Sequence, residues 1–464
     1  MSFMKKSAAA LVLTGVSVAV STAFAAGFQL TEQSSLGAGR AYAGAGIVGD
    51  DLSAVHYNPA GMTLLDGTRF QAGGVWIGLN ADFKGNNGES ENGRLKGQMI
   101  PAGYVTHQVN DKVWLGFAMT VPFGMGTEYD RNWEHANRGT SAKIYTFDMN
   151  PSIAYKVSDF ISVGAGVSVQ YAKANLGMRM DAMPGMSLAH AKVEADSWDW
   201  GYNLGIMFSP TDKLRFGLAY RSAIEHDADG DVKLSGFNPL LMAGLGDMAQ
   251  YLQDGYMMGT SATIKTPDTL MLTGTWEATD KLRLSGLIRW ANWSNFDNLT
   301  LNNDISSGMI NGLSGAMTNA ITGMVAQGMI SQQEAKVLAS KLPAVAGEMK
   351  NTTIENKWQD TWLFSIGADY RINSAFTVRG GLAYETSPVD DQSTRMAVIP
   401  DTDRVWFSLG ASWYPTQDLQ FDVGATYLMG VGDKDLYDSV GGKKVGKYDS
   451  LDAYLLGVQM QYRF

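Results

Sequence analysis

The sequence predicts an all-β protein, a 14-stranded antiparallel transmembrane β-barrel. Three observations predict it: long runs in which apolar and polar residues alternate, connections that are alternately short and long, and a chain that ends on an apolar strand. The 464 residues include 53 glycines, 11% aromatic residues and no cysteine. A secreted chain without cystines must be stabilised by extensive strand pairing or a large core.

The alternation is clearest in three segments. Residues 419–427 place an apolar side chain at every odd position and a polar residue or glycine at every even one, and residues 161–171 and 405–413 repeat the pattern. Period-2 alternation indicates strands with two different faces. Runs of about ten residues exceed the five or six of a typical strand in a soluble protein. Aromatic residues near the strand ends favour a lipid-facing wall with aromatic girdles over a soluble sandwich.

The connections between these strands differ systematically. One set is very short, as at residues 110–111, 158–159 and 373–374, and the other is long, above all at residues 226–263 and 297–356. Short periplasmic turns and long extracellular loops are typical of outer-membrane barrels, whose strand number is even. The expected strands are approximately 69–80, 97–108, 112–124, 143–157, 160–175, 196–209, 213–225, 264–277, 281–295, 357–371, 375–386, 403–414, 418–430 and 450–464.

The first residues indicate secretion. Lys5 and Lys6 precede an apolar run, residues 8–20, which ends in a small-residue stretch closing on Ala25-Ala26. This pattern predicts a cleavable signal peptide over residues 1–25. The apolar run, about 13 residues, is too short to cross a membrane core as a helix. No later stretch has about 18 consecutive apolar residues, so no transmembrane helix is expected.

The net charge and the histidines argue against several classes of function. A net charge of −10 argues against a nucleic-acid partner. The histidines lie in separate contexts without an evident serine partner, so we expect no enzyme activity. They also lack metal-ligand spacing, so neither a metal site nor a cofactor is expected. These histidines are His56, His107, His135, His190 and His226.

Residues 26–67 do not alternate. They are rich in glycine and alanine and contain Arg40, Asp50 and the tripeptide Asn58-Pro59-Ala60. A disordered tail would be more charged and less apolar. We therefore expect residues 26–67 to fold as short helical turns inside the lumen, as a hatch, and residues 68–464 to form the barrel.

Several motifs then resemble one family. The mature chain resembles the FadL family of outer-membrane transporters for long-chain fatty acids and other hydrophobic compounds. The N-terminal block is the most specific part, because barrel periodicity does not demand its residues. The motifs that carry the resemblance are Ala26-Gly27-Phe28-Gln29-Leu30, Gly39-Arg40-Ala41-Tyr42, Asp50-Asp51, Asn58-Pro59-Ala60, Thr127-Glu128, Ser387-Pro388-Val389, Ile399-Pro400-Asp401 and Tyr462-x-Phe464.

The resemblance implies roles for particular residues. Asn58, Pro59 and Ala60 would form the hatch motif, and Phe28 would lie against the ligand. Arg179 and Lys357 would bind the carboxylate head group, although neither matches the family's basic positions in register.

The family's third strand is kinked and opens the barrel wall. Candidates for the kink here are Pro122, Phe123 and Gly124, since proline cannot donate to a β-ladder and glycine weakens pairing. The alternative is an ordinary strand end beside a loop.

Two loops carry apolar residues at helical spacing, within residues 236–258 and 305–350, and both are rich in methionine. Methionine suits surfaces that accept varied apolar ligands. We expect an apolar capture groove between loops 226–263 and 297–356; alternatively, the helices only pack on one another.

These expectations combine into a function. The chain is expected to lie in the outer membrane of a Gram-negative bacterium as a monomer, assembled there by the barrel-assembly machinery through the strand that ends at Phe464. It would take up long-chain fatty acids passively, by loop capture, binding above the hatch and lateral release through the wall, since an apolar ligand is stable in lipid. The alternatives are uptake of neutral aromatic or aliphatic hydrocarbons, and a surface adhesin or phage receptor.

Overall fold

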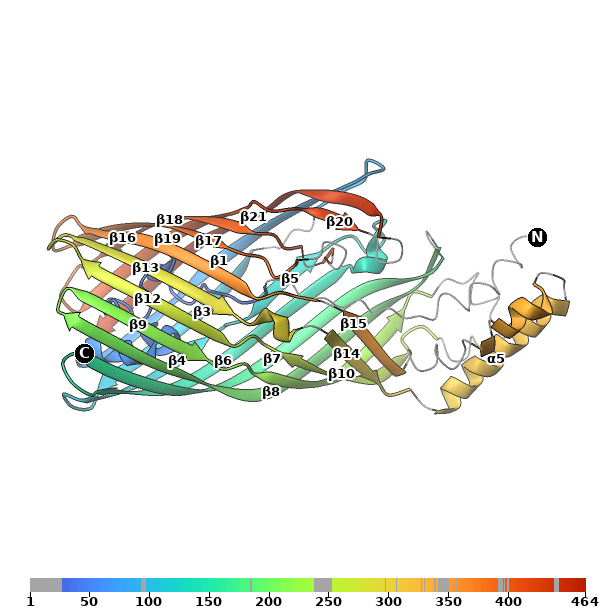
Figure 1. Cartoon of the computed structure of the whole chain (residues 1–464), viewed down its shortest axis with the longest axis horizontal. Coiled ribbons are helices and arrows are strands. Elements are labelled where there is room, and N and C mark those ends of the chain that lie inside the picture. The colour runs from blue at the N-terminus through green and yellow to red at the C-terminus, as the bar shows by residue number, and fades with distance from the viewer. Residues whose placement is uncertain are drawn as a thin grey trace.

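The computed structural model describes residues 27–464 except 93–96, 184–185, 238–252, 297, 306, 327, 329, 338, 341–349, 356, 391–394, 396, 399 and 438–441. The predicted signal peptide therefore lies outside the described residues. Within them, the strand segments form one antiparallel sheet that closes on itself, because β1 pairs with β21 from Arg69↔Arg463 to Gly85↔Gly446. The sheet is a closed 14-stranded barrel, as predicted (Figure 1).

Each of the 14 strands that circle the barrel is called a stave, and several staves are interrupted so that two segments make one stave. Staves 1 to 14 are, in order, β1 (Thr68–Gly85); β2 (Ser90–Asn92) with β3 (Gln98–Gln108); β4 (Val113–Thr120) with β5 (Gly124–Glu128); β6 (Ser141–Lys156); β7 (Ile161–Met183); β8 (Met186–Thr211); β9 (Leu214–Arg221) with β10 (Glu225–Ser235); β11 (Met257–Lys265) with β12 (Thr269–Glu277); β13 (Leu282–Ala291) with β14 (Asn298–Asn303); β15 (Asn351–Glu355) with β16 (Thr361–Arg371); β17 (Phe376–Glu385); β18 (Arg404–Trp413); β19 (Leu419–Gly430) with β20 (Asp435–Tyr437); and β21 (Lys444–Arg463).

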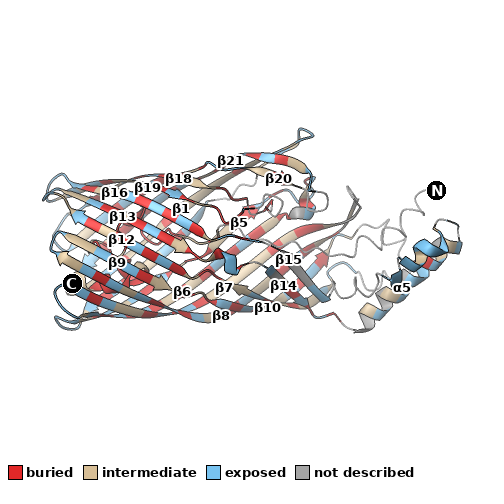
Figure 2. Cartoon of the chain, in the orientation of Figure 1, coloured by how far each residue is buried: buried red, intermediate tan, exposed pale blue. Residues whose placement is uncertain are grey.

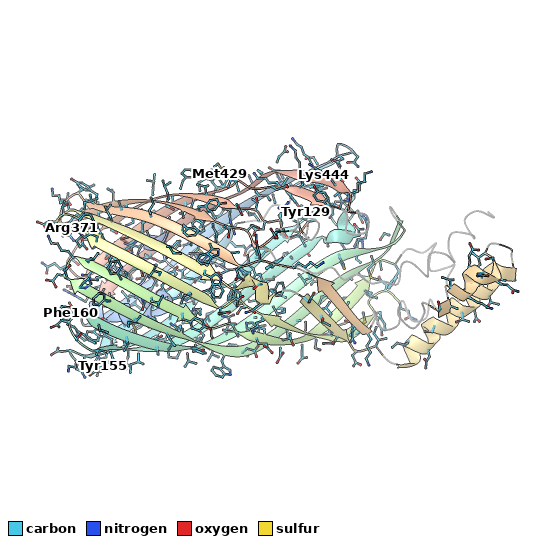
Figure 3. All side chains as sticks on the ribbon, in the orientation of Figure 1. Tyr129, Tyr155, Phe160, Arg371, Met429 and Lys444 are labelled. Carbon is cyan, nitrogen blue, oxygen red and sulfur yellow. The ribbon has the colours of Figure 1, made fainter. Side chains whose placement is uncertain are left out.

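The two ends of the barrel differ as the loop lengths predict. We call the end with short turns periplasmic and the end with long connections extracellular. Figure 3 shows Tyr155, Phe160 and Arg371 at the periplasmic end, and Tyr129 and Lys444 toward the other end.

The wall follows the period-2 pattern in the periplasmic half. On β7, Val163 and Val167 are exposed on the outside, whereas Ser168 and Gln170 are buried toward the lumen. Exposed and buried residues accordingly alternate along the strands in Figure 2. Near the extracellular limit of the apolar face, aromatic rings pack across neighbouring staves, as do those of Tyr171 and Trp198 at 5.2 Å. This arrangement fits an outer wall that contacts lipid and ends in an aromatic girdle.

The polarity of the wall inverts beyond the girdle. On β10, Asp227, Asp229 and Asp231 are exposed, while Val232 and Leu234 are buried. The connection expected at residues 226–263 is therefore occupied partly by β10 and β11, which extend staves 7 and 8. The strands continue because their alternation continues, with the apolar side turned to the inside instead of to lipid. Residues 238–252 of this connection lie outside the described residues.

The connection expected at residues 297–356 is also shorter than anticipated. It contains β14, β15 and the helix α5 (Ser307–Ala326), which projects beyond the extracellular end of the barrel (Figure 1). Among the residues that the structure describes, no helix is long and apolar enough to cross a membrane.

The N-terminal residues fold inside the barrel. We call residues 27–67 the luminal segment; it contains α2 (Ser35–Ala38), α3 (Ala54–Tyr57) and the 3-10 helix η1 (Pro59–Leu64), and most of its side chains are buried. It contacts staves on both sides of the barrel: η1 packs on β6, β7 and β8, while α2 packs on β18, β19 and β21. In Figure 1 its blue ribbon lies within the wall toward the periplasmic end.

Glycines in the wall make room for this segment. A Cβ atom on Gly424 would lie 2.1 Å from the carbonyl oxygen of Ser35, and one on Gly205 would lie 2.1 Å from Oδ1 of Asn58. No side chain fits at such a separation, so these wall positions allow the luminal segment to approach the strand backbone.

Candidate functional site

The luminal segment is fixed to the wall by buried ion pairs. Arg40, which is 2% exposed, contacts Asp50 at 2.8 Å within the segment and Asp369 on β16 at 3.4 Å. Asp50 in turn contacts Arg283 on β13 at 3.0 Å. Burial alone would raise the pKa of Asp50, but the Arg40 and Arg283 guanidinium groups hold it well below its usual range. The network therefore links segment and wall through charges that remain ionised.

Of the tripeptide Asn58-Pro59-Ala60, Asn58 lies between α3 and η1, and the other two residues begin η1. The Asn58 side chain accepts a hydrogen bond from the Ala60 amide at 3.1 Å and donates one to the Ile206 carbonyl of β8 at 3.2 Å. Pro59 starts η1, where its missing N–H leaves no donor unsatisfied. The motif thus caps a helix and attaches the luminal segment to stave 6.

The luminal segment also pairs with the interrupted third stave. Between β4 and β5, the Pro122 carbonyl accepts a hydrogen bond from the Leu30 amide at 2.8 Å, and the Gly124 amide donates to the Phe28 carbonyl at 2.7 Å. These bonds satisfy backbone groups that the wall itself leaves free at the interruption.

A glutamine side chain completes this contact. Gln33 donates from Nε2 to the Val121 carbonyl at 2.7 Å and accepts from the Val121 amide at 3.2 Å through Oε1. The Gln33 side chain therefore makes the two backbone hydrogen bonds to Val121 that a neighbouring strand would make, at the interruption of stave 3.

The seam between staves 2 and 3 is paired over only part of its length. Among the described residues, the ladder between β3 and β4 runs from Gln108↔Trp114 to Gly103↔Met119, whereas β5 pairs with β6 on its other side. Toward the extracellular end, residues 28–33 therefore cover the seam from the inside.

A cavity lies beside this covered seam. It has a volume of about 50 Å³ and lies between the luminal segment and staves 3, 5, 6, 7, 8 and 9. Its lining residues are Gln29, Leu30, Thr31, His56, Tyr57, Pro122, Phe123, Gln170, Asn203, Ala219, Tyr220, Arg221, Ser222, Ile224, Thr266, Pro267, Thr269, Met271 and Arg289.

Two arginines line the cavity. Arg289 donates to the Thr31 hydroxyl at 2.8 Å and to Glu385 at 2.9 Å. Arg221 donates to the Ser168 hydroxyl at 2.7 Å and to the carbonyl of His56 at 2.9 Å. Neither arginine is among the residues that the sequence predicted as ligand contacts.

The residues predicted to bind a head group lie elsewhere. Arg179 is buried and donates to the carbonyls of Trp133 at 2.9 Å and Glu134 at 3.0 Å, beyond the extracellular rim of the cavity. Lys357 is exposed, with a left-handed backbone φ of 50°. The cavity lining includes neither residue. Arg179 lies this far along the barrel because β7 continues past the girdle to Met183.

Phe28 sits in a cluster of aromatic rings. Its ring centroid lies 4.9 Å from that of Trp293, 5.5 Å from that of Phe123 and 6.4 Å from that of Phe296. The Trp358 ring lies 5.1 Å from Trp293 and 5.0 Å from Phe296. Only the family resemblance pointed to Phe28. Trp293 and Trp358 lie in segments predicted as continuous strands, 281–295 and 357–371, and nothing in the local pattern indicates that the staves are interrupted there.

The aromatic cluster adjoins an apolar part of the inner wall. Buried apolar residues of β7, β8, β10 and β14 share one cluster with Phe28. We call these inward-facing side chains the apolar lining, defined by Leu176, Met178, Val193, Val232, Leu234 and Leu301. The interior of a porin is polar, so this part of the lumen differs from a water-filled pore.

Glu32 of the luminal segment predicts a pH dependence. Burial, and then the nearby Glu385 carboxylate, raise the pKa of Glu32 to about 7, although Arg404 and Arg289 oppose the shift. A carboxyl whose folded pKa is raised stabilises the fold below its ordinary pKa, and this contribution is lost as the pH rises toward the folded pKa. Stability should therefore fall between about pH 4.5 and 7 by no more than about 3 kcal/mol, and Glu32→Gln should flatten this slope.

The measurement is the denaturant midpoint of detergent-solubilised protein across this pH range, for wild type and Glu32→Gln. Equal slopes in the two proteins would exclude Glu32 as the titrating group. Glu225→Gln is the control, because Glu225 is exposed at the start of β10.

The chain was compared with known proteins. The profile of a family described as "Outer membrane protein transport protein (OMPP1/FadL/TodX)" matches residues 16–464. A long-chain fatty acid transport protein of Escherichia coli O6:H1 is 28% identical, with 95% of each chain covered. Outer membrane protein P1 of Haemophilus influenzae is 29% identical over 92% of this chain and 91% of its own length.

Solved structures share the fold. A Pseudomonas aeruginosa FadL homologue matches with a TM-score of 0.76 at 22% identity, covering 94% of this chain and 100% of its own. The Ralstonia pickettii toluene transporter TbuX matches with a TM-score of 0.65 at 17% identity, covering 94% and 100%. At these identities the likeness shows the fold alone.

Proposed function

Because this chain belongs to the OMPP1/FadL/TodX family of outer membrane transport proteins, we propose that it takes up long-chain fatty acids passively across the outer membrane. The activity is transport without catalysis. The apolar lining is the observation that carries the proposal. An acyl chain that packs against these buried aliphatic side chains leaves water, which is favourable by roughly 0.8 kcal/mol for each CH₂ group.

The proposed ligand path runs from the apolar lining to the cavity. The apolar lining adjoins the Phe28 ring cluster, and Phe123 belongs both to that cluster and to the residues around the cavity. A carboxylate that reached the cavity would find Arg289 and Arg221, which offer charge-assisted hydrogen bonds. We propose these two arginines as head-group contacts in place of Arg179 and Lys357.

The luminal segment acts as the hatch in this proposal. Its residues 28–33 cover the seam between staves 2 and 3 through a few backbone hydrogen bonds. A ligand that displaces the Phe28 ring also pulls on the Leu30–Pro122 and Phe28–Gly124 bonds, and so uncovers the seam. The ligand then leaves sideways into the membrane, where its tail stays out of water.

The test is ligand binding to purified protein. We expect Arg289→Gln to weaken oleate binding by roughly tenfold or more, the loss expected for a hydrogen bond to a charged group. Toluene, which has no carboxylate, should bind the variant and the wild type equally. Lys357→Gln is the matched control and should leave oleate affinity unchanged, because Lys357 lies away from the cavity.

The same measurement distinguishes a second function, uptake of neutral hydrocarbons. The ring cluster of Phe28, Trp293, Phe296 and Trp358 favours this function, since aromatic ligands pack well against offset or edge-on rings. If toluene binds more tightly than oleate and Arg289→Gln leaves both affinities intact, the second function replaces the first.

Assembly is part of the proposal. The chain ends on β21, and Phe464, which is 78% exposed, donates its amide to the Thr68 carbonyl at 2.9 Å. We expect the barrel-assembly machinery to recognise this terminal strand and the folded protein to be a monomer.

A further inference from the structure

Two extracellular connections meet above the seam. Glu89 lies in the hairpin between β1 and β2, while Glu134 and His135 lie in the connection between β5 and β6. One carboxylate oxygen of each glutamate and one ring nitrogen of His135 all lie within 4.8 Å of one another. The backbone amide of Glu134 donates to Oε1 of Glu89 at 2.8 Å, which fixes the two connections together.

The second oxygen of Glu89 points to a ligand. Oε2 is shielded from solvent and has no hydrogen-bond partner in the structure. A buried oxygen of a carboxylate without a partner is costly. Two carboxylates in contact need either a shared proton or a cation between them.

The histidine is held in place by packing. The His135 ring lies edge-on to Phe83 at 5.6 Å and to Trp133 at 5.4 Å. The connection that carries it is fixed by Arg179, which donates to the carbonyls of Trp133 and Glu134, and by the Trp133 indole, which donates to the Gly139 carbonyl at 3.0 Å. Arg179 therefore positions this connection.

We propose that Glu89, Glu134 and His135 bind a divalent transition-metal ion such as Zn²⁺. Two carboxylate oxygens and one imidazole nitrogen are three ligands that zinc accepts, with water in a fourth position. Imidazole favours zinc, copper or nickel over calcium or magnesium, which prefer oxygen ligands alone. The spacing of these residues in the sequence gave no sign of the site, because two separate connections supply them.

The metal would bridge the outer end of the seam. Glu89 belongs to the hairpin that joins staves 1 and 2, and the other two ligands belong to the connection that joins staves 3 and 4. Between them lies the seam whose ladder ends at Gly103↔Met119. A bound ion therefore ties the two sides of this seam together at its extracellular end, independently of the luminal segment.

The experiment uses full-length mature protein without a polyhistidine tag, stripped of metal with EDTA. Zn²⁺ is titrated in competition with a chromophoric chelator, and Co²⁺ replaces Zn²⁺ so that its visible absorption reports the ligand geometry. We expect one ion per chain, and affinity weakened by more than about tenfold in Glu89→Gln and in His135→Gln.

The matched control is His107→Gln, since His107 lies at the periplasmic end of stave 2 and should not affect the site. Retention of the folded, heat-modifiable band in SDS gels shows that each variant still forms its barrel. Binding that is absent from the wild type, or equal in all variants, overturns the proposal; absence would mean that the glutamates share a proton. Neither the Zn²⁺ titration nor the Co²⁺ spectrum depends on which molecule the protein transports.

Discussion

Arg40→Ala is expected to loosen the luminal segment and to lower the free energy of unfolding by about 4 kcal/mol, the typical cost of removing one partner from a buried ion pair. Arg40 is the central cation of the network, since it contacts Asp50 in the segment and Asp369 in the wall. Without it, four carboxylates, those of Asp50, Glu277, Asp369 and Asp422, share the remaining guanidinium groups of Arg283 and Arg379. The excess negative charge then favours displacement of the segment.

Two measurements check this result. The unfolding midpoint should fall, and the conductance of single barrels in a planar bilayer should rise because ions gain a path through the lumen. Arg463→Gln is the control, since Arg463 pairs with Asp418 at the exposed periplasmic rim, where ion pairs contribute at most about 1 kcal/mol. The double variant Arg40→Met with Asp369→Asn should recover part of the loss, because it removes the uncompensated charge. Wild-type stability and conductance in Arg40→Ala would contradict the anchoring role.

Phe28→Ala is expected to destabilise the closed position of residues 28–33 by about 4 kcal/mol, the usual cost of emptying a buried phenylalanine site. The effect is local, because a few hydrogen bonds to stave 3 hold this end of the segment while Arg40 holds the rest. The protein has no cysteine, so a single Gln29→Cys substitution provides a clean reporter of exposure.

Labelling of that cysteine with a membrane-impermeant maleimide should accelerate by more than about a hundredfold in Phe28→Ala. Phe28→Leu keeps most of the apolar volume and should give a smaller increase. Phe160→Ala, at an exposed periplasmic turn, should give none. Equal labelling rates in Phe28→Ala and wild type would show that the ring does not hold the segment closed.

The sequence predicted the barrel well because the wall obeys one rule, a period of two, over most of its length. Residues 161–171 show why: every second side chain must face lipid, so the pattern leaves no other register. Beyond the girdle the period of two continues with opposite polarity, since Asp229 is exposed and Val232 is buried. Because the apolar residues there face inward, this part of the strand was interpreted as a loop.

The site was less predictable because it joins residues that are distant in the sequence. Nothing local indicates that Gln33 replaces a strand beside Val121, or that Arg289 meets Thr31. The position of Arg179 outside the cavity was unpredictable for a related reason. A shift of a few residues along β7 moves a side chain such as Arg179 from the lumen to the extracellular rim, and periodicity alone does not measure height along a strand.

The glycines of the wall have a consequence for biogenesis. The luminal segment rests against Gly205 on stave 6 and Gly424 on stave 13, and the ladder between β1 and β21 joins the two ends of the chain. That ladder has the greatest sequence separation in the sheet, so it carries the largest loop-closure cost and is expected to form late. The luminal segment must therefore already lie among the staves when the first and last strands pair, so that the barrel closes around it.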